Sequence, residues 1–158
     1  MTTLLYRTTV AILGLFILGL LFGQILVPIF AKQIAFDFPE VSHLVAPYSV
    51  LGILTLLCLQ IAFVLIGILL RRGNHERFFS RSSRTIIKAI ASAATLGCLI
   101  PVATAIHLFA TIHAGGPAVM LGALASATGA IGFCCLGAVA VRAFDHLRAE
   151  HDELEAVI

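Results

Sequence analysis

Residues Arg71–Lys88 read RRGNHERFFSRSSRTIIK and separate two hydrophobic runs that are each long enough to cross a bilayer. This central segment holds six of the ten Lys and Arg residues of the chain. Connections rich in Lys and Arg are retained on the cytoplasmic side of a membrane. The central segment therefore predicts the orientation of the helices on both sides of it.

The composition indicates an integral membrane protein. Of 158 residues, 60% are apolar and only 11% are charged, whereas about a quarter are charged in soluble domains. The mean hydropathy is +1.08. Four crossings of roughly 20 apolar residues each occupy nearly the whole chain, so we predict a single integral membrane domain over residues 1–158. The net charge of +2 is dispersed between apolar runs, which gives no footprint for nucleic-acid binding.

The hydrophobic runs predict an all-α fold, a four-helix transmembrane bundle with a short cytoplasmic helical tail. We place the transmembrane helices at about 8–30, 48–70, 86–112 and 118–141, and the tail at 142–158. Pro28 and Pro101 lie inside two of these helices and are expected to kink them. The connection from Ala31 to Pro47 is expected to lie on the membrane surface, with a short helix that begins at Pro39.

The distribution of positive residues predicts that both termini are cytoplasmic. Nine of the ten lie on one side, namely Arg7, the six of the central segment, Arg142 and Arg148, and only Lys32 lies on the other. Residues of the central segment are expected to fix this topology and to contact anionic lipid headgroups: Arg71, Arg72, Arg77, Arg81, Arg84 and Lys88.

Small and polar residues within the runs suggest how the helices pack. Small side chains allow helices to approach closely in membranes, and we expect this role for Gly19, Gly23, Gly122, Ser126 and Gly129. Two amides, Gln24 and Gln60, lie inside the first and second runs. Their simplest role is a hydrogen bond to a neighbouring helix, which we favour over contact with a ligand.

The sequence contains no catalytic constellation. No Asp, Glu, Arg or Lys lies in the interior of a predicted helix, so the carboxylate expected of a four-helix proton-coupled exporter is missing. The four cysteines, Cys58, Cys98, Cys134 and Cys135, lie in apolar runs without a C-x-x-C motif, and we expect free thiols. There is no pair of intramembrane histidines for a haem. We predict a protein that is not an enzyme and has no cofactor.

One group of polar residues on the outer side is a candidate ligand site. Imidazole and carboxylate groups bind divalent transition metals, and histidines also act as pH sensors. Interfacial hydrogen bonding by scattered polar groups is the simpler interpretation, and we favour it. The candidates are Asp37, Glu40, His43, His107 and His113.

Several short motifs occur in order along the chain: Gly23-Gln24, Pro39-Glu40-Val41-Ser42-His43-Leu44, Pro47-Tyr48, Phe78-Phe79-Ser80, Gly115-Gly116-Pro117, Leu-Arg-Ala-Glu at 147–150 and Leu-Glu-Ala-Val-Ile at 154–158. In this order they resemble the actinobacterial branch of the bacterial membrane-protein family called domain of unknown function two-nine-seven-five. The resemblance implies four transmembrane helices, a bacterial inner membrane and genes that neighbour small helix-turn-helix regulators. It implies no catalytic residues.

Two functions remain open. The first is a non-enzymatic accessory or regulatory membrane protein that presents the central segment and the tail to a cytoplasmic protein partner. The second is a small transporter or sensor that uses Gln24, Gln60 and a polar stripe formed by Thr104, His107 and Thr111. The oligomeric state is not predicted. The acidic tail is expected to lie near the basic central segment, and its acidic residues are Asp145, Glu150, Asp152, Glu153 and Glu155.

Overall fold

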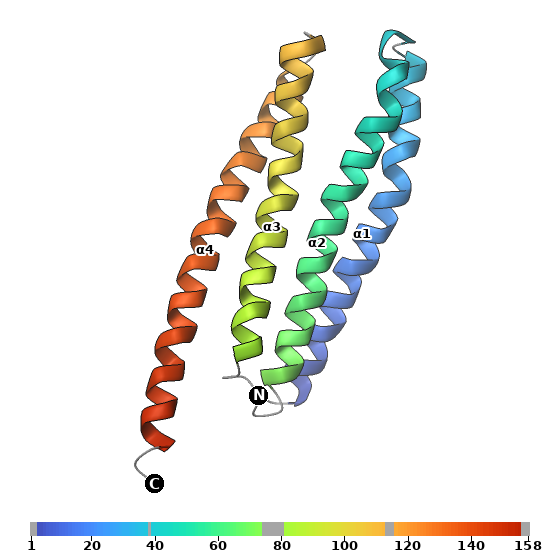
Figure 1. Cartoon of the computed structure of the whole chain (residues 1–158). Helices are drawn as coiled ribbons and strands as arrows, with labels where there is room; N and C mark the ends of the chain where they lie inside the picture. Colours follow the sequence, from blue (N-terminus) through green and yellow to red (C-terminus); the bar gives the residue numbers. More distant parts are fainter. Residues whose placement is uncertain (1–2, 38, 74–80, 113–115, 156–158) are drawn as a thin grey trace.

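The computed structural model describes residues 3–37, 39–73, 81–112 and 116–155, which form four long helices and two short helical segments (Figure 1). The described residues contain no strand, so the fold is all-α, as predicted. The elements are α1 (Thr3–Asp37), the 3₁₀-helix η1 (Pro39–Leu44), α2 (Val45–Gly73), α3 (Arg81–His107), the π-helix η2 (Leu108–Ile112) and α4 (Pro117–Glu155).

Four helical stretches are long and apolar enough to cross a membrane: Leu4–Phe36, Ser42–Gly73, Ser82–Ala110 and Pro117–Glu150. Each of the four predicted spans falls on one of them. The helices extend beyond the apolar spans because Lys, Arg, Glu and Ala are good helix formers in water as well as in lipid. The tail is accordingly a continuation of α4, which is about 58 Å long at 1.5 Å per residue.

The first connection is shorter than the sequence suggested. We expected the connection to begin at Ala31, but α1 continues to Asp37. The residues after Ala31 include no helix breaker, and the helix ends two residues before Pro39, since a proline disfavours α geometry in the residue that precedes it. The short helix that begins at Pro39 is the 3₁₀-helix η1.

The helices pack in sequential order. α1 packs on α2, α2 on α3 and α3 on α4, and each pair is antiparallel (Figure 1). Among the described residues, no Cα atom of α1 lies within 8 Å of a Cα atom of α4. In Figure 1, α2 and α3 stand between α1 and α4. The start of α1 and the end of α4 lie at the same end of the molecule, and the described parts of α1 and α4 do not pack on each other.

Small side chains occupy the contacts between helices. The buried apolar residues are mostly alanines and a cysteine, among them Cys58, Ala62, Ala94 and Ala130. Large apolar side chains point outward instead, for example Phe22, which is 65% exposed. Lipid tails remove any hydrophobic drive to bury large side chains, so close approach by small residues is what holds membrane helices together.

Both intrahelical prolines are accommodated within α-helix. α1 continues through Pro28 and α3 continues through Pro101. The predicted span 86–112 is nevertheless not α-helical throughout, because it ends in the π-helical turn of Leu108–Ile112. The departure from α geometry thus lies about two to three turns beyond Pro101.

Candidate functional site

A pair of amides links α1 to α2. The side-chain Nε2 of Gln24 donates a hydrogen bond of 2.8 Å to Oε1 of Gln60, and Gln60 is only 7% exposed. The Nε2 atom of Gln60 and the Oγ atom of Ser49 are buried and have no hydrogen-bond partner among the described residues. The sequence named both glutamines, but it did not identify them as partners. Their similar depth appears only with the observed helix bounds, since Gln24 lies 13 residues before the end of α1 and Gln60 lies 15 residues after the start of α2.

The α1–α2 contact around this pair is close. A Cβ atom added at Gly52 would lie 3.0 Å from a methyl group of Val27, and one added at Gly67 would lie 3.1 Å from Leu13. Phe16 and Phe63 stack with ring centroids 5.4 Å apart. Because α1 contacts no other long helix, these contacts and the amide pair are what hold it.

An open groove of about 470 Å³ is lined by all four long helices. α1 contributes Val27, and the polar members of its lining are Tyr48, Thr55, Thr104 and Ser126. The hydroxyls of Thr55 and Thr104 donate to carbonyls of their own helices, at 2.9 and 2.8 Å. Most of the remaining lining is apolar and includes neither Gln24, Gln60 nor His107, so the groove offers few polar groups to a ligand.

Tyr48 and His107 connect α2 to α3 at one end of this groove. The hydroxyl of Tyr48 lies 2.9 Å from Nδ1 of His107, and the two rings meet edge to face. Thr104 and His107 share the predicted polar stripe, and the third member, Thr111, falls in the π-helix with its side chain outside the described set. The sequence analysis considered Tyr48 only as part of the motif Pro47-Tyr48, so the contact between Tyr48 and His107 was not predicted.

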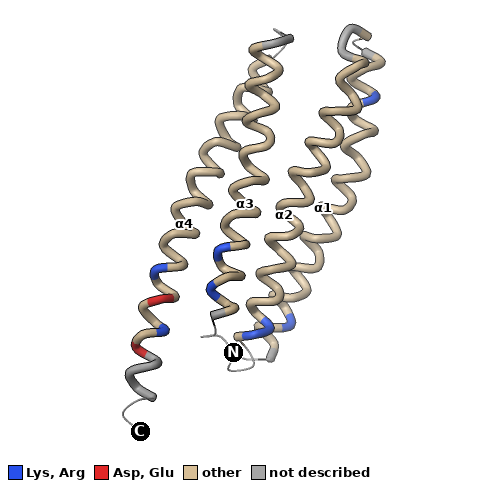
Figure 2. Tube along the Cα trace, in the orientation of Figure 1, with Lys and Arg blue, Asp and Glu red and all other residues tan. Residues whose placement is uncertain are grey.

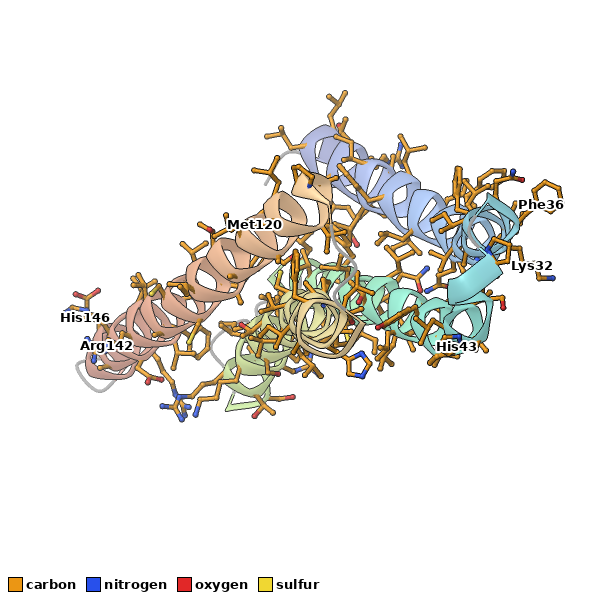
Figure 3. The ribbon with its side chains drawn as sticks, turned by 90° about the horizontal axis from the view of Figure 1, so that it is seen from above. Lys32, Phe36, His43, Met120, Arg142 and His146 are labelled. Atoms are coloured by element: carbon orange, nitrogen blue, oxygen red, sulfur yellow. The ribbon has the colours of Figure 1, made fainter. Side chains whose placement is uncertain are left out.

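The candidate ligand residues on the outer side are only partly described. His107 lies against Tyr48, whereas His43 is exposed in η1 and lies at the corner of α1 and α2 near Lys32 (Figure 3). The side chains of Asp37 and Glu40 and the whole of His113 lie outside the described residues. Among the described His, Cys, Asp and Glu residues, no group of three or more could hold a metal ion.

The four cysteines are free thiols. Cys58 is buried at the crossing of α2 and α3, where it lies against Gly97, and Cys98 lies opposite Gly129 on α4. Cys134 and Cys135 are exposed on α4. The four cysteines are spread over three helices, and Cys58 and Cys98 contribute to the packing of these helices.

The charged end of the molecule contains a fork-like ion pair. Nε of Arg84 on α3 donates to Oδ1 of Asp145 at 2.7 Å, and its second donor, Nη2, reaches Oδ2 at 2.8 Å. Two parallel hydrogen bonds fix the orientation of both groups. Next to the pair, Phe144 is 3% exposed and Ser83 is fully buried. The start of the tail is therefore docked on the first turn of α3.

The other residues of the central segment lie near this end. Arg71 and Arg72 close α2, and Lys88 lies one turn beyond Arg84 on α3. Figure 2 shows this concentration of Lys and Arg at the end where the chain begins and finishes, with Lys32 at the opposite end. Several residues of the central segment and the tail lie outside the described set: Arg77, Ser80, the side chain of Arg81 and the side chains of Asp152, Glu153 and Glu155.

The small residues expected at helix contacts divide into two groups. A Cβ atom at Gly23 would lie 3.3 Å from Leu56, and one at Gly129 would lie 3.3 Å from Sγ of Cys98. Gly19 and Gly122, by contrast, have no neighbour within 4 Å of such an atom. Gly122 and Ser126 instead line the groove between the four helices.

These features define a class: an all-α, multi-pass membrane protein with four apolar helices packed in sequential order. A family model described as "Protein of unknown function (DUF2975)" matches residues 29–158. The chain therefore belongs to the DUF2975 family, as the resemblance indicated. The match is to the family as a whole, so the actinobacterial branch stays a prediction. No curated protein and no solved structure matches the chain.

Proposed function

We propose that this protein is a non-enzymatic accessory or regulatory protein of the bacterial cytoplasmic membrane. Both termini face the cytoplasm, and the charged end of the molecule is presented to a cytoplasmic protein partner. The orientation is supported by the positive charges, because nine of the ten lie in segments that the sequence places on the side of the termini. The described Lys and Arg residues are concentrated at the same end of the molecule (Figure 2).

The observation that carries this proposal is the docking of the tail on α3. The two hydrogen bonds between Arg84 and Asp145 and the buried ring of Phe144 hold α4 in a fixed direction as it leaves the apolar region. Beyond this point α4 carries an exposed mixed surface, with Leu147 50% exposed and Glu150 exposed beside it. A rigid helix with an exposed leucine among charges suits recognition by a protein partner.

The absence of charged groups from the apolar spans supports a non-enzymatic role. Several intramembrane polar side chains are engaged with each other or with their own backbone, as in the pair Gln24 and Gln60 and in the hydroxyls of Thr55 and Thr104. Among the described residues, Nε2 of Gln60 and Oγ of Ser49 are buried without such a partner. The contacts that do form stabilise helix packing and leave no arranged nucleophile, acid or base.

The test is photocrosslinking in native membranes, with a photoreactive residue at Leu147 and a control at Met120, which is exposed at the other end of α4. We expect one discrete protein adduct from Leu147 and none of the same mass from Met120. Arg84→Asp alone should weaken the adduct by releasing the tail, and Arg84→Asp together with Asp145→Arg should restore it. The proposal is contradicted if both positions give an adduct of the same mass. It is also contradicted if the yield of the Leu147 adduct is unchanged by Arg84→Asp.

The groove lined by four helices favours a second candidate function, a small transporter or sensor. Such a role requires water to enter the groove at Thr104, which lines it, and to reach His107, Gln24 and Gln60, which do not line it. In a cysteine-free background, Ser126→Cys should then react with a polar thiol reagent, whereas Leu136→Cys, which is exposed on α4 away from the groove, should not. Equal lack of reactivity at both positions excludes this alternative.

A further inference from the structure

A second groove, of about 640 Å³, lies between α3 and α4 at the charged end. It extends from Lys88 and Arg142 at that end to Leu99 and Cys134 nearer the middle of the helices. Lys88 and Leu99 are about 17 Å apart along α3 at 1.5 Å per residue. Half of a bilayer's hydrocarbon core is about 15 Å thick, so the groove has the length of one leaflet.

Small residues make the floor of this groove. A Cβ atom added at Gly137 would overlap the side chain of Ala91, which means that α3 and α4 are as close here as their backbones allow. Ala138 is also small and lines the groove. The larger side chains of Leu96 and Val141 line it as well, so the surface between them is concave and apolar.

The mouth of the groove carries an excess of positive charge. Arg84 is engaged with Asp145 through two hydrogen bonds, and Lys88 interacts electrostatically with the same carboxylate. Lys88 and Arg142 are exposed and form no salt bridge with a described carboxylate. Two exposed cations that form no salt bridge with a described carboxylate thus lie at the mouth of a mostly apolar groove. This arrangement suits a phosphate group attached to an acyl chain.

We infer that this groove is a binding site for one anionic phospholipid, with the phosphate between Lys88 and Arg142 and one acyl chain along Leu96 and Leu99. This inference goes beyond the proposed function, because it requires only that the helices cross a bilayer and not that a protein partner exists. The small floor residues provide the shape, and the two cations provide the preference for negative charge.

The chain contains no tryptophan, which permits a direct test by fluorescence quenching. Leu99→Trp places a fluorophore at the deep end of the groove, and Leu136→Trp places one on α4 outside it. Both full-length variants are reconstituted singly in phosphatidylcholine nanodiscs, to which phosphatidylglycerol or phosphatidylcholine with brominated acyl chains is added. At low ionic strength we expect a preference for phosphatidylglycerol at Leu99→Trp of about fivefold for each cation. No such preference is expected at Leu136→Trp.

Charge variants then identify the source of the preference. Lys88→Gln with Arg142→Gln should abolish it, Lys88→Arg should keep it, and Lys32→Gln, which removes a charge at the opposite end, should leave it unchanged. The charge variants can also be compared by native mass spectrometry in the background that carries no introduced tryptophan. The amount of phosphatidylglycerol that each variant retains should follow the same order as the preference measured by quenching. Equal quenching by both lipids at Leu99→Trp, or an equal preference at both tryptophan positions, overturns the inference. So does loss of quenching by both lipids when two copies occupy one disc, because a second copy would then cover the groove.

Discussion

Replacing the amide pair between α1 and α2 should reveal a measurable coupling between the two helices. Gln24 donates to Gln60 at 2.8 Å, and both residues can be changed to methionine, which has a similar shape and helix propensity but cannot form this bond. The informative quantity is the difference between the effect of the double change and the sum of the two single changes.

The magnitude follows from the environment of each amide. In Gln24→Met, the carbonyl of Gln60 loses its partner in a site that is 7% exposed, and an unpaired buried polar group costs about 1 to 3 kcal/mol. Gln60→Met should cost less, since it also removes the buried Nε2 atom that has no partner among the described residues. Hydrogen bonds between membrane helices average about 0.6 kcal/mol and reach about 1.7 kcal/mol. The double variant should therefore be less destabilised than the sum of the single variants by about that amount.

The measurement is reversible unfolding in mixed micelles of dodecyl maltoside and sodium dodecyl sulfate, followed by circular dichroism. The matched control pairs Gln24→Met with Thr128→Val, because Thr128 bonds only to a carbonyl of its own helix α4, which does not contact α1 among the described residues. The control energies should add. Additive energies for Gln24 and Gln60 as well would refute the reasoning that this bond links the helices.

Three further outcomes are expected. In a cysteine-free background, Gly73→Cys should be labelled only from the cytoplasm and Gly116→Cys only from outside, and the reverse pattern contradicts the proposed topology. Gly137→Ala should lower the free energy of unfolding by about 1 to 3 kcal/mol through overpacking. Gly132→Ala should raise it by about 0.5 to 1 kcal/mol, because a Cβ atom at Gly132 would have no neighbour within 4 Å. Equal effects of the two changes would show that the α3–α4 contact is not tight. Tyr48→Phe should cost about 0.5 to 1.5 kcal/mol in the same micelle assay, and an unchanged stability would show that its bond to the histidine of α3 contributes nothing.

The number and type of the helices could be predicted because each apolar run is a local property of the sequence. The run that precedes Arg71 and the run that follows Lys88 are each long enough to cross a bilayer without reference to any other part of the chain. The continuation of α1 to Asp37 was missed for a related reason: a polar, helix-forming segment looks like a connection when hydropathy alone marks the boundary.

The partners within the fold could not be predicted, because they depend on how the helices are arranged. Gln24 and Gln60 were each expected to form a hydrogen bond with a neighbouring helix. The residues around each glutamine do not indicate that the two bond to each other. The lack of packing between α1 and α4 among the described residues could not be predicted either. Lipid solvates apolar faces as well as protein does, so nothing forces four membrane helices to close into a ring. Gly19 and Gly137 show the same limit: their local sequences both favour close packing, yet only Gly137 is at a tight contact.

The sequential packing of the helices has a consequence for biogenesis. Each long helix after the first packs on the helix synthesised immediately before it, so no contact between described long helices must wait for a distant part of the chain to leave the ribosome. Contacts that are close in sequence form quickly. We expect the protein to enter the membrane one hairpin at a time, with α1 and α2 already paired when α3 emerges. Assembly of this fold then needs no rearrangement of helices after the last one has been inserted.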